Sequence, residues 1–381
     1  MPQGVRVRVS PPAQQSIQYY FMSEENFTAN NFTNFPDTSS YTWSSPSNIA
    51  LIKYWGKNKN QIPKNTSISF TLSNSRTITT LELNKKSKAD NNILFDVYYK
   101  DKKIDEFKPK IDLFFRNILK YCSYLKRYSF KVTTENTFPH SSGIASSASG
   151  MSALALCIMS LEKDLDSTLK EEYFYKKASF LSRIGSGSAC RSILGGINLW
   201  GKHIDIEKST DLYSIKYPYE ICKDFLDYND TILLVDTEPK QVSSSQGHEL
   251  MKNHIYADKR YKIAQKNVIR LKSILKDGNL HSFTSLIEEE AMMLHALMMT
   301  SNPSYVLIKP NTLKIINSIK SYRETTKIPI CFTLDAGANV HVLYPKEGEK
   351  EVELFIESEL KKYCKNYSFI SDKVGKGAVQ L

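Results

Sequence analysis

A small polar loop, residues 139–150 with the sequence PHSSGIASSASG, constrains this chain more than any other stretch. A strand-like run, residues 128–133, leads into it, and a helix-like run, roughly residues 147–161, leads out. Two glycines and five serines leave the loop with almost no bulk, so backbone N–H groups can approach a ligand closely. The helix that follows adds free N–H donors and the positive end of its dipole. The pattern predicts an anion site that suits phosphate, and the alternative is a serine-rich connector that caps a core helix.

Length and charge narrow the classes of protein. The 381 residues are enough for two or three domains. A net charge of +11 suits nucleic acid, a membrane surface or a small polyanionic substrate. The lysines are spread along the chain, with neither zinc-finger spacing nor an RNA-binding aromatic signature, which favours a solvated basic surface. No apolar run approaches the ~18 residues that a membrane span needs, so we expect no membrane association. Because the nucleic-acid signatures are missing, we expect no nucleic acid partner either.

The cysteines indicate a reducing compartment. None of the six belongs to a C-x-x-C pair, and four lie in apolar or small-residue runs. They therefore predict buried thiols, with neither a disulfide framework nor a metal site. The first residues lack the apolar core of a signal peptide. We expect a cytoplasmic protein.

The order of strands and helices predicts an α+β fold. Residues 1–43 are polar, without sustained periodicity, and are expected to form a flexible tail. Residues 49–54 form a predicted buried strand, and residues 66–72 and 76–83 alternate as two antiparallel strands would. Helices follow each cluster of strands, which argues against a run of βαβ units.

A second domain is predicted from about residue 226, giving domains at 44–225 and 226–381. Its first strand is the apolar run 231–235, after which the chain is mostly helical. Two strands, residues 328–334 and 340–344, flank the turn at residues 335–339, and residues 373–379 form a predicted closing strand.

Three residues suit chemistry on anions. Lys57 lies just beyond the end of a strand, and Arg191 follows a small-residue loop, where its planar fork can hold a carboxylate or phosphate. Asp335 leaves a buried strand at a tight turn, as a general base aimed into a cleft would. Taken singly, each also fits a structural role: a surface lysine, an ion pair, or a turn-capping aspartate.

The combined wording of five motifs resembles the diphosphomevalonate decarboxylases of the GHMP kinase superfamily. The motifs are NIALIKYWGK at 48–57 with IPKNTSIS at 62–69, the loop at 139–150, GSGSACRS at 185–192, VSSSQG at 242–247 and FTLDAGAN at 332–339. VGKG at 374–377 also resembles the family's C-terminal strand, so the resemblance covers residues 45–381. The chain departs from the family's pattern at Ala338, where proline is usual, at His140, where a smaller residue is common, and at His248, where an apolar residue is usual.

The resemblance implies a two-domain GHMP kinase fold with the active cleft between the domains. The first domain is expected to be like domain 2 of ribosomal protein S5, and the second to be a ferredoxin-like α/β domain. The implied reaction uses ATP, with Mg²⁺, to phosphorylate the C3 hydroxyl of mevalonate 5-diphosphate and then release phosphate and carbon dioxide, giving isopentenyl diphosphate. A homodimer is also implied.

Roles carry over by motif, with Asp335, Arg191 and Lys57 as the implied catalytic residues. The resemblance places the substrate against Asn48, Tyr54, Trp55, Gly56, Lys57, Arg76, Ser186, Gly187, Ser188, Ala189, Cys190, Arg191 and Ser245. It places ATP against Pro139, Ser142, Gly143, Ala145, Ser146, Ser147 and Ser149, with Ser147 near Mg²⁺ and the metal ligands otherwise unknown. The open alternatives are a mevalonate monophosphate decarboxylase, a small-molecule kinase of the same superfamily, and, more remotely, a basic nucleic-acid-binding protein.

Overall fold

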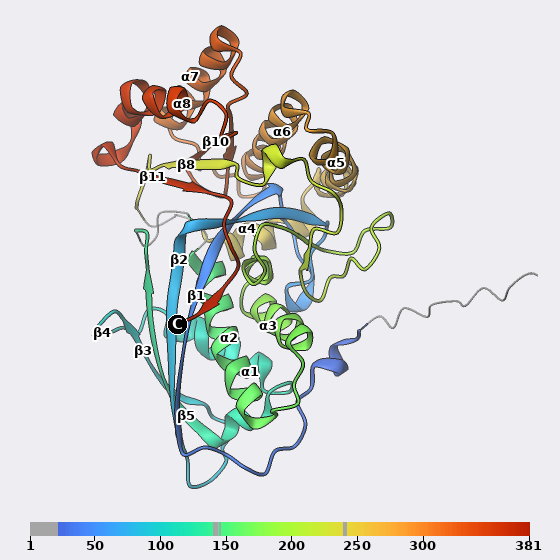
Figure 1. Ribbon diagram of the computed structural model, residues 1–381, viewed down its shortest axis with the longest axis vertical. Coiled ribbons are helices and arrows are strands. Elements are labelled where there is room, and N and C mark those ends of the chain that lie inside the picture. The colour runs from blue at the N-terminus through green and yellow to red at the C-terminus, as the bar shows by residue number, and fades with distance from the viewer. Residues whose placement is uncertain (1–21, 140–143, 145, 239–241) are drawn as a thin grey trace, which may run out of the picture.

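The computed structural model describes residues 22–139, 144, 146–238 and 242–381, and in these it contains two β-sheets with helices packed against each. Figure 1 shows the first sheet and its helices in the lower half of the view and the second in the upper half. Short 3-10 turns and one π-helical turn join the longer elements; they are Glu24–Phe27, Lys59–Gln61, Ser123–Arg127, Gly187–Ser192, Lys223–Phe225, Met251–Asn253, Ile356–Leu360 (π), Lys361–Tyr363 and Lys365–Tyr367.

The first sheet has the strand order β12-β1-β2-β5-β3-β4, with β6 added to β2 and β7 added to β6. Its pairs are antiparallel, apart from the parallel pair of β3 and β5. The strands are β1 (Thr38–Ile52), β2 (Ser67–Lys85), β3 (Leu94–Tyr99), β4 (Lys102–Lys103), β5 (Tyr128–Asn136), β6 (Ile197–Trp200), β7 (Ile215–Lys216) and β12 (Val379–Gln380).

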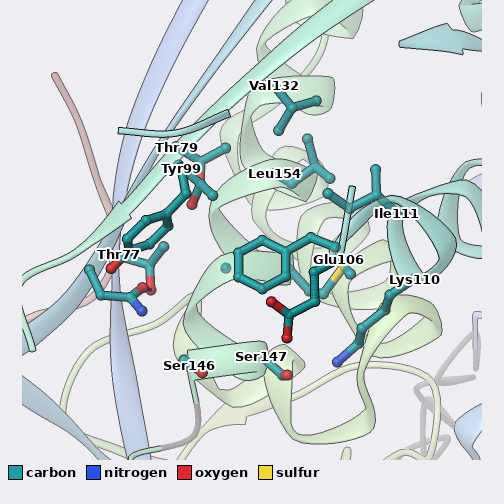
Figure 2. A pocket seen from close by; sticks show the side chains of 15 residues that line it. Thr77, Thr79, Tyr99, Glu106, Lys110, Ile111, Val132, Ser146, Ser147 and Leu154 are labelled. Atoms are coloured by element: carbon teal, nitrogen blue, oxygen red, sulfur yellow. Dashed lines mark hydrogen bonds between the residues drawn. The ribbon is translucent and has the colours of Figure 1, made fainter. Parts of the chain in front are cut away.

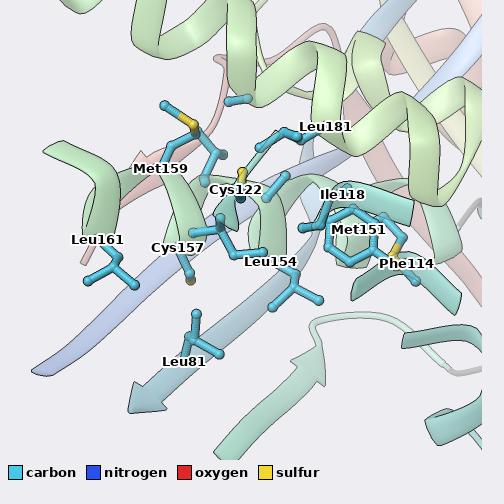
Figure 3. Packing of buried hydrophobic residues seen from close by; sticks show 14 of the residues in the cluster. Leu81, Phe114, Ile118, Cys122, Met151, Leu154, Cys157, Met159, Leu161 and Leu181 are labelled. Atoms are coloured by element: carbon cyan, nitrogen blue, oxygen red, sulfur yellow. The ribbon is translucent and has the colours of Figure 1, made fainter. Parts of the chain in front are cut away.

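Three helices, α1 (Lys108–Ile118), α2 (Ser146–Leu165) and α3 (Glu171–Gly185), form the core of the first domain with this sheet. The central one, α2, is buried almost all round, from Ala148 to Glu162, because its small and apolar residues fit between the sheet and α3. Figure 3 shows side chains of α2 packed with Leu81 of β2, Phe114 and Ile118 of α1, and Leu181 of α3. This packing fixes the direction of α2, and therefore where its N-terminus lies.

The second sheet is antiparallel with the order β11-β8-β10-β9, formed by β8 (Asn229–Leu233), β9 (Cys331–Leu334), β10 (Val340–Tyr344) and β11 (Phe369–Lys373). Helices α4 (Ser244–Leu250), α5 (Ala257–Asp277), α6 (Leu280–Met299) and α7 (Pro310–Thr326) lie between its first two strands in the chain, and α8 (Glu349–Phe355) precedes the last. This βαββαβ order is the ferredoxin-like arrangement. The predicted α+β fold with a ferredoxin-like second domain is confirmed.

The predicted flexible tail is wrong for residues 22–43. Strand β1 begins at Thr38, and Tyr41 and Trp43 alternate inward with polar neighbours. Phe27 is fully buried and stacks on Phe180, with ring centroids 4.3 Å apart. Alternating aromatic side chains were the signal of this strand, since they give it a buried face. The part of the expected tail at residues 1–21 lies outside the described residues.

Two further strand predictions need correction. The predicted strands at 66–72 and 76–83 are one strand, β2, since the carboxylate of Asp372 accepts hydrogen bonds from the backbone N–H groups of Ser73, Asn74 and Ser75 at 2.7–2.8 Å. This contact from the far end of the chain stabilises the polar stretch in an extended form. The predicted closing strand at 373–379 is β11 and β12 with an irregular segment between them, and β12 pairs with β1. The boundary near residue 226 stays a prediction.

The six cysteines are free thiols, five of them buried. In the described residues no helix is both long enough and apolar enough to cross a membrane. Neither observation conflicts with the expectations from composition.

Candidate active site

A cavity of about 490 Å³, called the cleft below, opens between the two domains. Both halves of the chain line it, which agrees with the predicted position of the active site. Its walls are formed by Asn48, Ala50, Tyr54, Trp55, Lys57, Gln61, Glu106, Phe107, Lys110, Ser146, Ser147, Ala148, Gly185, Ser186, Gly187, Ser188, Arg191, Ser243, Ser244, Ser245, His248, Asp335 and Ala336.

Arg191 lies in the floor of the cleft at the end of the small-residue loop that joins α3 to β6. Its side chain is buried, and its guanidinium donates from Nε to Asn48 Oδ1 at 3.3 Å and from Nη1 to Ser67 Oγ at 2.8 Å. Burial lowers the pKa of Arg191 from its usual value, but an arginine stays charged in this setting. The remaining nitrogen, Nη2, has no partner within the described part of the chain, so the fork is oriented and can still bind an anion.

Strand β1 ends at Ile52, two residues earlier than predicted, and Lys57 follows after an irregular segment, where it forms an isolated β-bridge with Pro63 and is half-buried in the cleft wall. Its Nζ donates to Gln61 Oε1 at 2.9 Å. Burial lowers the pKa of Lys57, opposed by Glu249. Gly56 has φ +98°, a backbone conformation that favours glycine, and a Cβ there would lie 2.0 Å from the Tyr261 hydroxyl.

Asp335 leaves β9 at the turn before β10, as predicted, and its half-buried side chain lines the cleft. The backbone carbonyl of Asp335 lies 3.1 Å from Nε2 of His295, which is buried on α6. This contact holds the turn against the helix. The predicted general base is therefore positioned by the fold at the cleft wall.

Lys53 is a buried cation that the sequence analysis missed. It is 1% exposed, and its Nζ has no hydrogen-bond partner among the residues that the structure describes. Burial lowers its pKa to about 8, partly opposed by the negative charges of Asp335 and Glu290. A lysine inside a strand predicted to be buried was the available signal, since such residues are seldom buried without a functional or ionic partner.

The N-terminus of α2 points its first residues, Ser146 and Ser147, into the cleft. A second, smaller cavity of about 180 Å³ adjoins it and shares Glu106, Lys110 and these two serines. Figure 2 shows the four side chains at one end of this cavity and the apolar Ile111, Val132 and Leu154 at the other. The arrangement can hold a molecule with a charged part at the helix end and a flat apolar part beyond it.

Neither cavity is lined by four of the predicted ligand contacts, Arg76, Ser149, Ala189 and Cys190. Arg76 donates to the backbone oxygens of Ser44 and Gly377 at 3.0 and 2.8 Å, which fastens β12 to the sheet. Ser149 is fully buried, and its hydroxyl pairs with Thr77 Oγ1 at 2.6 Å. The side chains of Ala189 and Cys190 are fully buried on the core side of their loop. Local motif wording could not show which side of a short turn faces the core.

The other predicted contacts divide by location. Those that line the cleft are Asn48, Tyr54, Trp55, Lys57, Ser146, Ser147, Ser186, Gly187, Ser188, Arg191, Ser245 and Asp335. Gly56 and Pro139 also line neither cavity. The backbone N–H of Gly56 donates to Nδ1 of His248, a residue of the cleft wall. The predicted ATP contacts at residues 142, 143 and 145 lie outside the described residues. Among described residues, sequence reasoning missed Glu106, Lys110 and His248.

The donor set fits a magnesium ion carried by phosphates. No group of three or more histidine, cysteine, aspartate or glutamate side chains forms an all-protein metal cage in the described ranges. Glu106 and Ser147 do offer oxygen ligands where the two cavities meet. Mg²⁺ is usually held by one or two such ligands together with substrate phosphates and water.

Comparison with known proteins agrees with this geometry. Residues 45–211 match the family described as the diphosphomevalonate decarboxylase-like N-terminal domain, and residues 231–378 match the mevalonate 5-diphosphate decarboxylase C-terminal domain. The diphosphomevalonate decarboxylase of Schizosaccharomyces pombe is 29% identical over 327 residues, which cover 82% of this chain and 80% of that one.

Solved structures are similar over the same range. The mevalonate diphosphate decarboxylase of Staphylococcus aureus has a TM-score of 0.77 and 27% identity, and the match covers 90% of this chain and 98% of that one. A structure described as MDDEF in complex with MVAPP, AMPPCP and magnesium has a TM-score of 0.76 and 26% identity, covering 90% of this chain and 99% of that one. The matched residues thus extend over both domains.

Proposed function

Because the chain belongs to the diphosphomevalonate decarboxylase family, we propose that it uses ATP to convert mevalonate 5-diphosphate into isopentenyl diphosphate. ATP phosphorylates the C3 hydroxyl, giving ADP. The new phosphate then leaves with its bonding electrons, and the bond between C2 and the carboxylate breaks to form the C2–C3 double bond and carbon dioxide. This is a step of isoprenoid synthesis by the mevalonate pathway.

The chemistry requires a cleft that holds several anions close together. A tertiary hydroxyl is a poor leaving group until it is phosphorylated, and loss of phosphate builds positive charge at C3. The substrate carboxylate, its diphosphate and the ATP phosphates must be held together while this happens. Fixed cations and N–H groups in a partly enclosed site do this best, because they need no reorganisation during the reaction.

The convergence of three separate groups carries the proposal. Arg191 is braced by Asn48 and Ser67, which suits binding of the substrate carboxylate through its free guanidinium face. Lys57 lies on the same cleft wall as a partner for the diphosphate. Asp335 is placed to accept the proton of the C3 hydroxyl. The three residues come from three separate sequence motifs, and nothing in one motif requires the other two motifs to be close to it in the fold.

The ATP phosphates are assigned to the N-terminus of α2, with the nucleoside in the smaller cavity of Figure 2. Ser146 and Ser147 provide hydroxyls and the helix end provides N–H groups. Mg²⁺, when bound, neutralises charge on the phosphates. Lys110 and Glu106 stand at the junction of the cavities, beside the expected position of the transferred phosphate.

The test is an assay of ADP formation with carbon dioxide trapped, run with mevalonate monophosphate and mevalonate diphosphate in parallel. The proposal expects both products, with the diphosphate strongly preferred. Preference for the monophosphate would assign the chain to the sister decarboxylation. ADP formation without carbon dioxide would indicate a kinase.

Two further parts of the proposal concern assembly and location. The free thiols agree with a reducing compartment, and we assign the protein to the cytoplasm. A homodimer is expected from the family resemblance. Sedimentation of the purified protein measures the second point, and fractionation of cells that express it measures the first.

A further inference from the structure

His248 lies on the helix α4, and its side chain packs against the segment that follows β1. The ring stands beside the rings of Tyr54 and Trp55, with centroids 4.5 and 4.6 Å away. It is 7% exposed, and it lines the cleft wall. Neighbouring Gly247 makes this approach possible, since a Cβ at that position would lie 2.4 Å from the Trp55 ring.

The hydrogen bond to Gly56 fixes the tautomer of His248. The backbone N–H of Gly56 donates to Nδ1 at 2.9 Å. A backbone N–H can only donate, so Nδ1 must be unprotonated and the single ring proton must be on Nε2. A second proton on Nδ1 would point at the Gly56 N–H. The ring is therefore neutral, and burial together with the charge of Lys57 lowers its pKa to about 3, opposed by Asp335.

The proton on Nε2 has no acceptor among the residues that the structure describes. Its neighbourhood points to an anionic one. His248 and Lys57 together line both the cleft and an adjoining cavity of about 420 Å³, whose other charged residues are Lys59, Lys64, Lys252, Glu249 and Asp258, with Glu249 paired to Lys252. Lys57 and His248 are the two residues that line both cavities, whereas Arg191 lines only the cleft. This is the end of the cleft where the diphosphate of the proposed substrate would lie.

We propose that His248 is a substrate-binding residue whose Nε2–H donates a hydrogen bond to the diphosphate of mevalonate diphosphate, beside Lys57. The assignment rests on the proposed function. A neutral donor on a rigid ring adds direction to a site whose other diphosphate partner, Lys57, is a flexible point charge. It also binds the anion without changing its own charge over the working range of pH.

Two substitutions separate donation to the substrate from the structural bond. His248→Asn keeps an acceptor oxygen near the Nδ1 position for Gly56 and removes the distant donor. His248→Gln reaches the Nε2 position with an amide N–H and loses the acceptor for Gly56. Calorimetry with mevalonate diphosphate, and separately with ATP, measures the dissociation constants, and thermal melting checks the fold.

We expect His248→Asn to weaken binding of mevalonate diphosphate by about 10- to 100-fold, the loss of one hydrogen bond to a charged group, and to leave ATP binding unchanged. His248→Gln should retain most of the affinity. Normal affinity in His248→Asn, or equal weakening in both variants, would overturn the proposal and assign the histidine to packing. Wild-type protein that binds no mevalonate diphosphate would instead overturn the proposed function, and this assignment with it.

Discussion

Two buried lysines in the same domain have opposite surroundings. Lys177, on α3, is fully buried in the core, where its Nζ donates to Glu162 Oε1 at 2.7 Å and to the Tyr121 carbonyl at 3.2 Å. Lys53, at the end of β1, is 1% exposed, and its Nζ lacks any partner within the described part of the chain.

We interpret Lys177 as a charge that stabilises the fold and Lys53 as a charge that acts on the cleft. Glu162 is completed by the Tyr124 hydroxyl at 2.9 Å, so the core group is a closed network. The ammonium of Lys53 instead lies in the field of Asp335, and an unpaired buried charge costs stability. We interpret that cost as the consequence of keeping positive charge beneath a site that receives anions.

The largest effect is expected at Asp335, the residue whose negative charge acts on the ammonium of Lys53. Asp335→Asn is nearly isosteric but cannot accept the hydroxyl proton. A positioned general base is worth about 10²- to 10⁴-fold in rate, so ADP formation and carbon dioxide release should fall together by that factor. Substrate and nucleotide binding, measured by calorimetry, should change little. Near-normal turnover would assign Asp335 to capping its turn, a role that asparagine fills equally well.

Lys177→Met tests the lysine that is paired in the core. It leaves the carboxylate of Glu162 buried without its ion-pair partner, which typically costs about 3–5 kcal/mol of the free energy of unfolding. Denaturant titration measures the loss. Because Lys177 is remote from the cleft, the Michaelis constants of the folded variant should match those of the wild type. A stable variant, or one with altered substrate binding, would remove the distinction between the two lysines.

Lys53→Met tests the unpaired lysine through the pH dependence of the free energy of unfolding. The folded pKa of Lys53 is about 8, below the unfolded value of about 10.5, so the unfolded chain binds more protons between these values. The contribution of Lys53 to stability therefore rises with pH across this window, by roughly 3 kcal/mol. Subtracting the pH profile of Lys53→Met from that of the wild type isolates it. The variant should be at least as stable at pH 7 and should turn over more slowly. A flat difference would show that the ammonium has a partner.

Arg191→Lys gives the smallest of these effects. It keeps the charge but loses the paired geometry that Asn48 and Ser67 orient. One lost hydrogen bond to a charged group corresponds to about 10- to 100-fold in turnover, with ATP binding retained. Equal loss in turnover and ATP affinity would place Arg191 at the nucleotide. The same assay on Arg183→Lys, a buried arginine that donates to the Leu212 carbonyl at 2.7 Å, controls for general damage.

What the sequence could predict depended on how local each signal was. Lys57, Arg191 and Asp335 each stand beside a small-residue turn, so their motifs were readable one by one, and the fold brings them into one cavity. Lys53 lies inside the motif at 48–57 and His248 directly follows the motif at 242–247, but neither stood out as a site residue. Their surroundings depend on the charge of Asp335 and the backbone of Gly56, which lie 282 and 192 residues away in the chain. The continuity of β2 depended in the same way on Asp372.

Ser149 and Arg76 line neither cavity, so their predicted ligand contacts stay predictions. Each lies in or near a motif rich in ligand-binding residues, yet the Ser149 hydroxyl pairs with Thr77 and the Arg76 guanidinium donates to the Gly377 carbonyl, in the segment before β12. A helix turns its side chains through about 100° per residue, so serines two positions apart, such as Ser147 and Ser149, point in nearly opposite directions. Ser147 faces the cleft and Ser149 the sheet. Sequence predicts the loop as a site, and only the packing of α2 decides which of its hydroxyls are available.

The most direct test of the decarboxylase assignment is the stoichiometry of a single turnover. Excess enzyme is mixed with ATP and mevalonate diphosphate labelled at the carboxyl carbon, and ADP and labelled carbon dioxide are counted in each quenched sample. A decarboxylase gives equal amounts of the two products at completion, with none of either when the substrate is left out. ADP that accumulates while the label stays on the substrate would contradict the assignment.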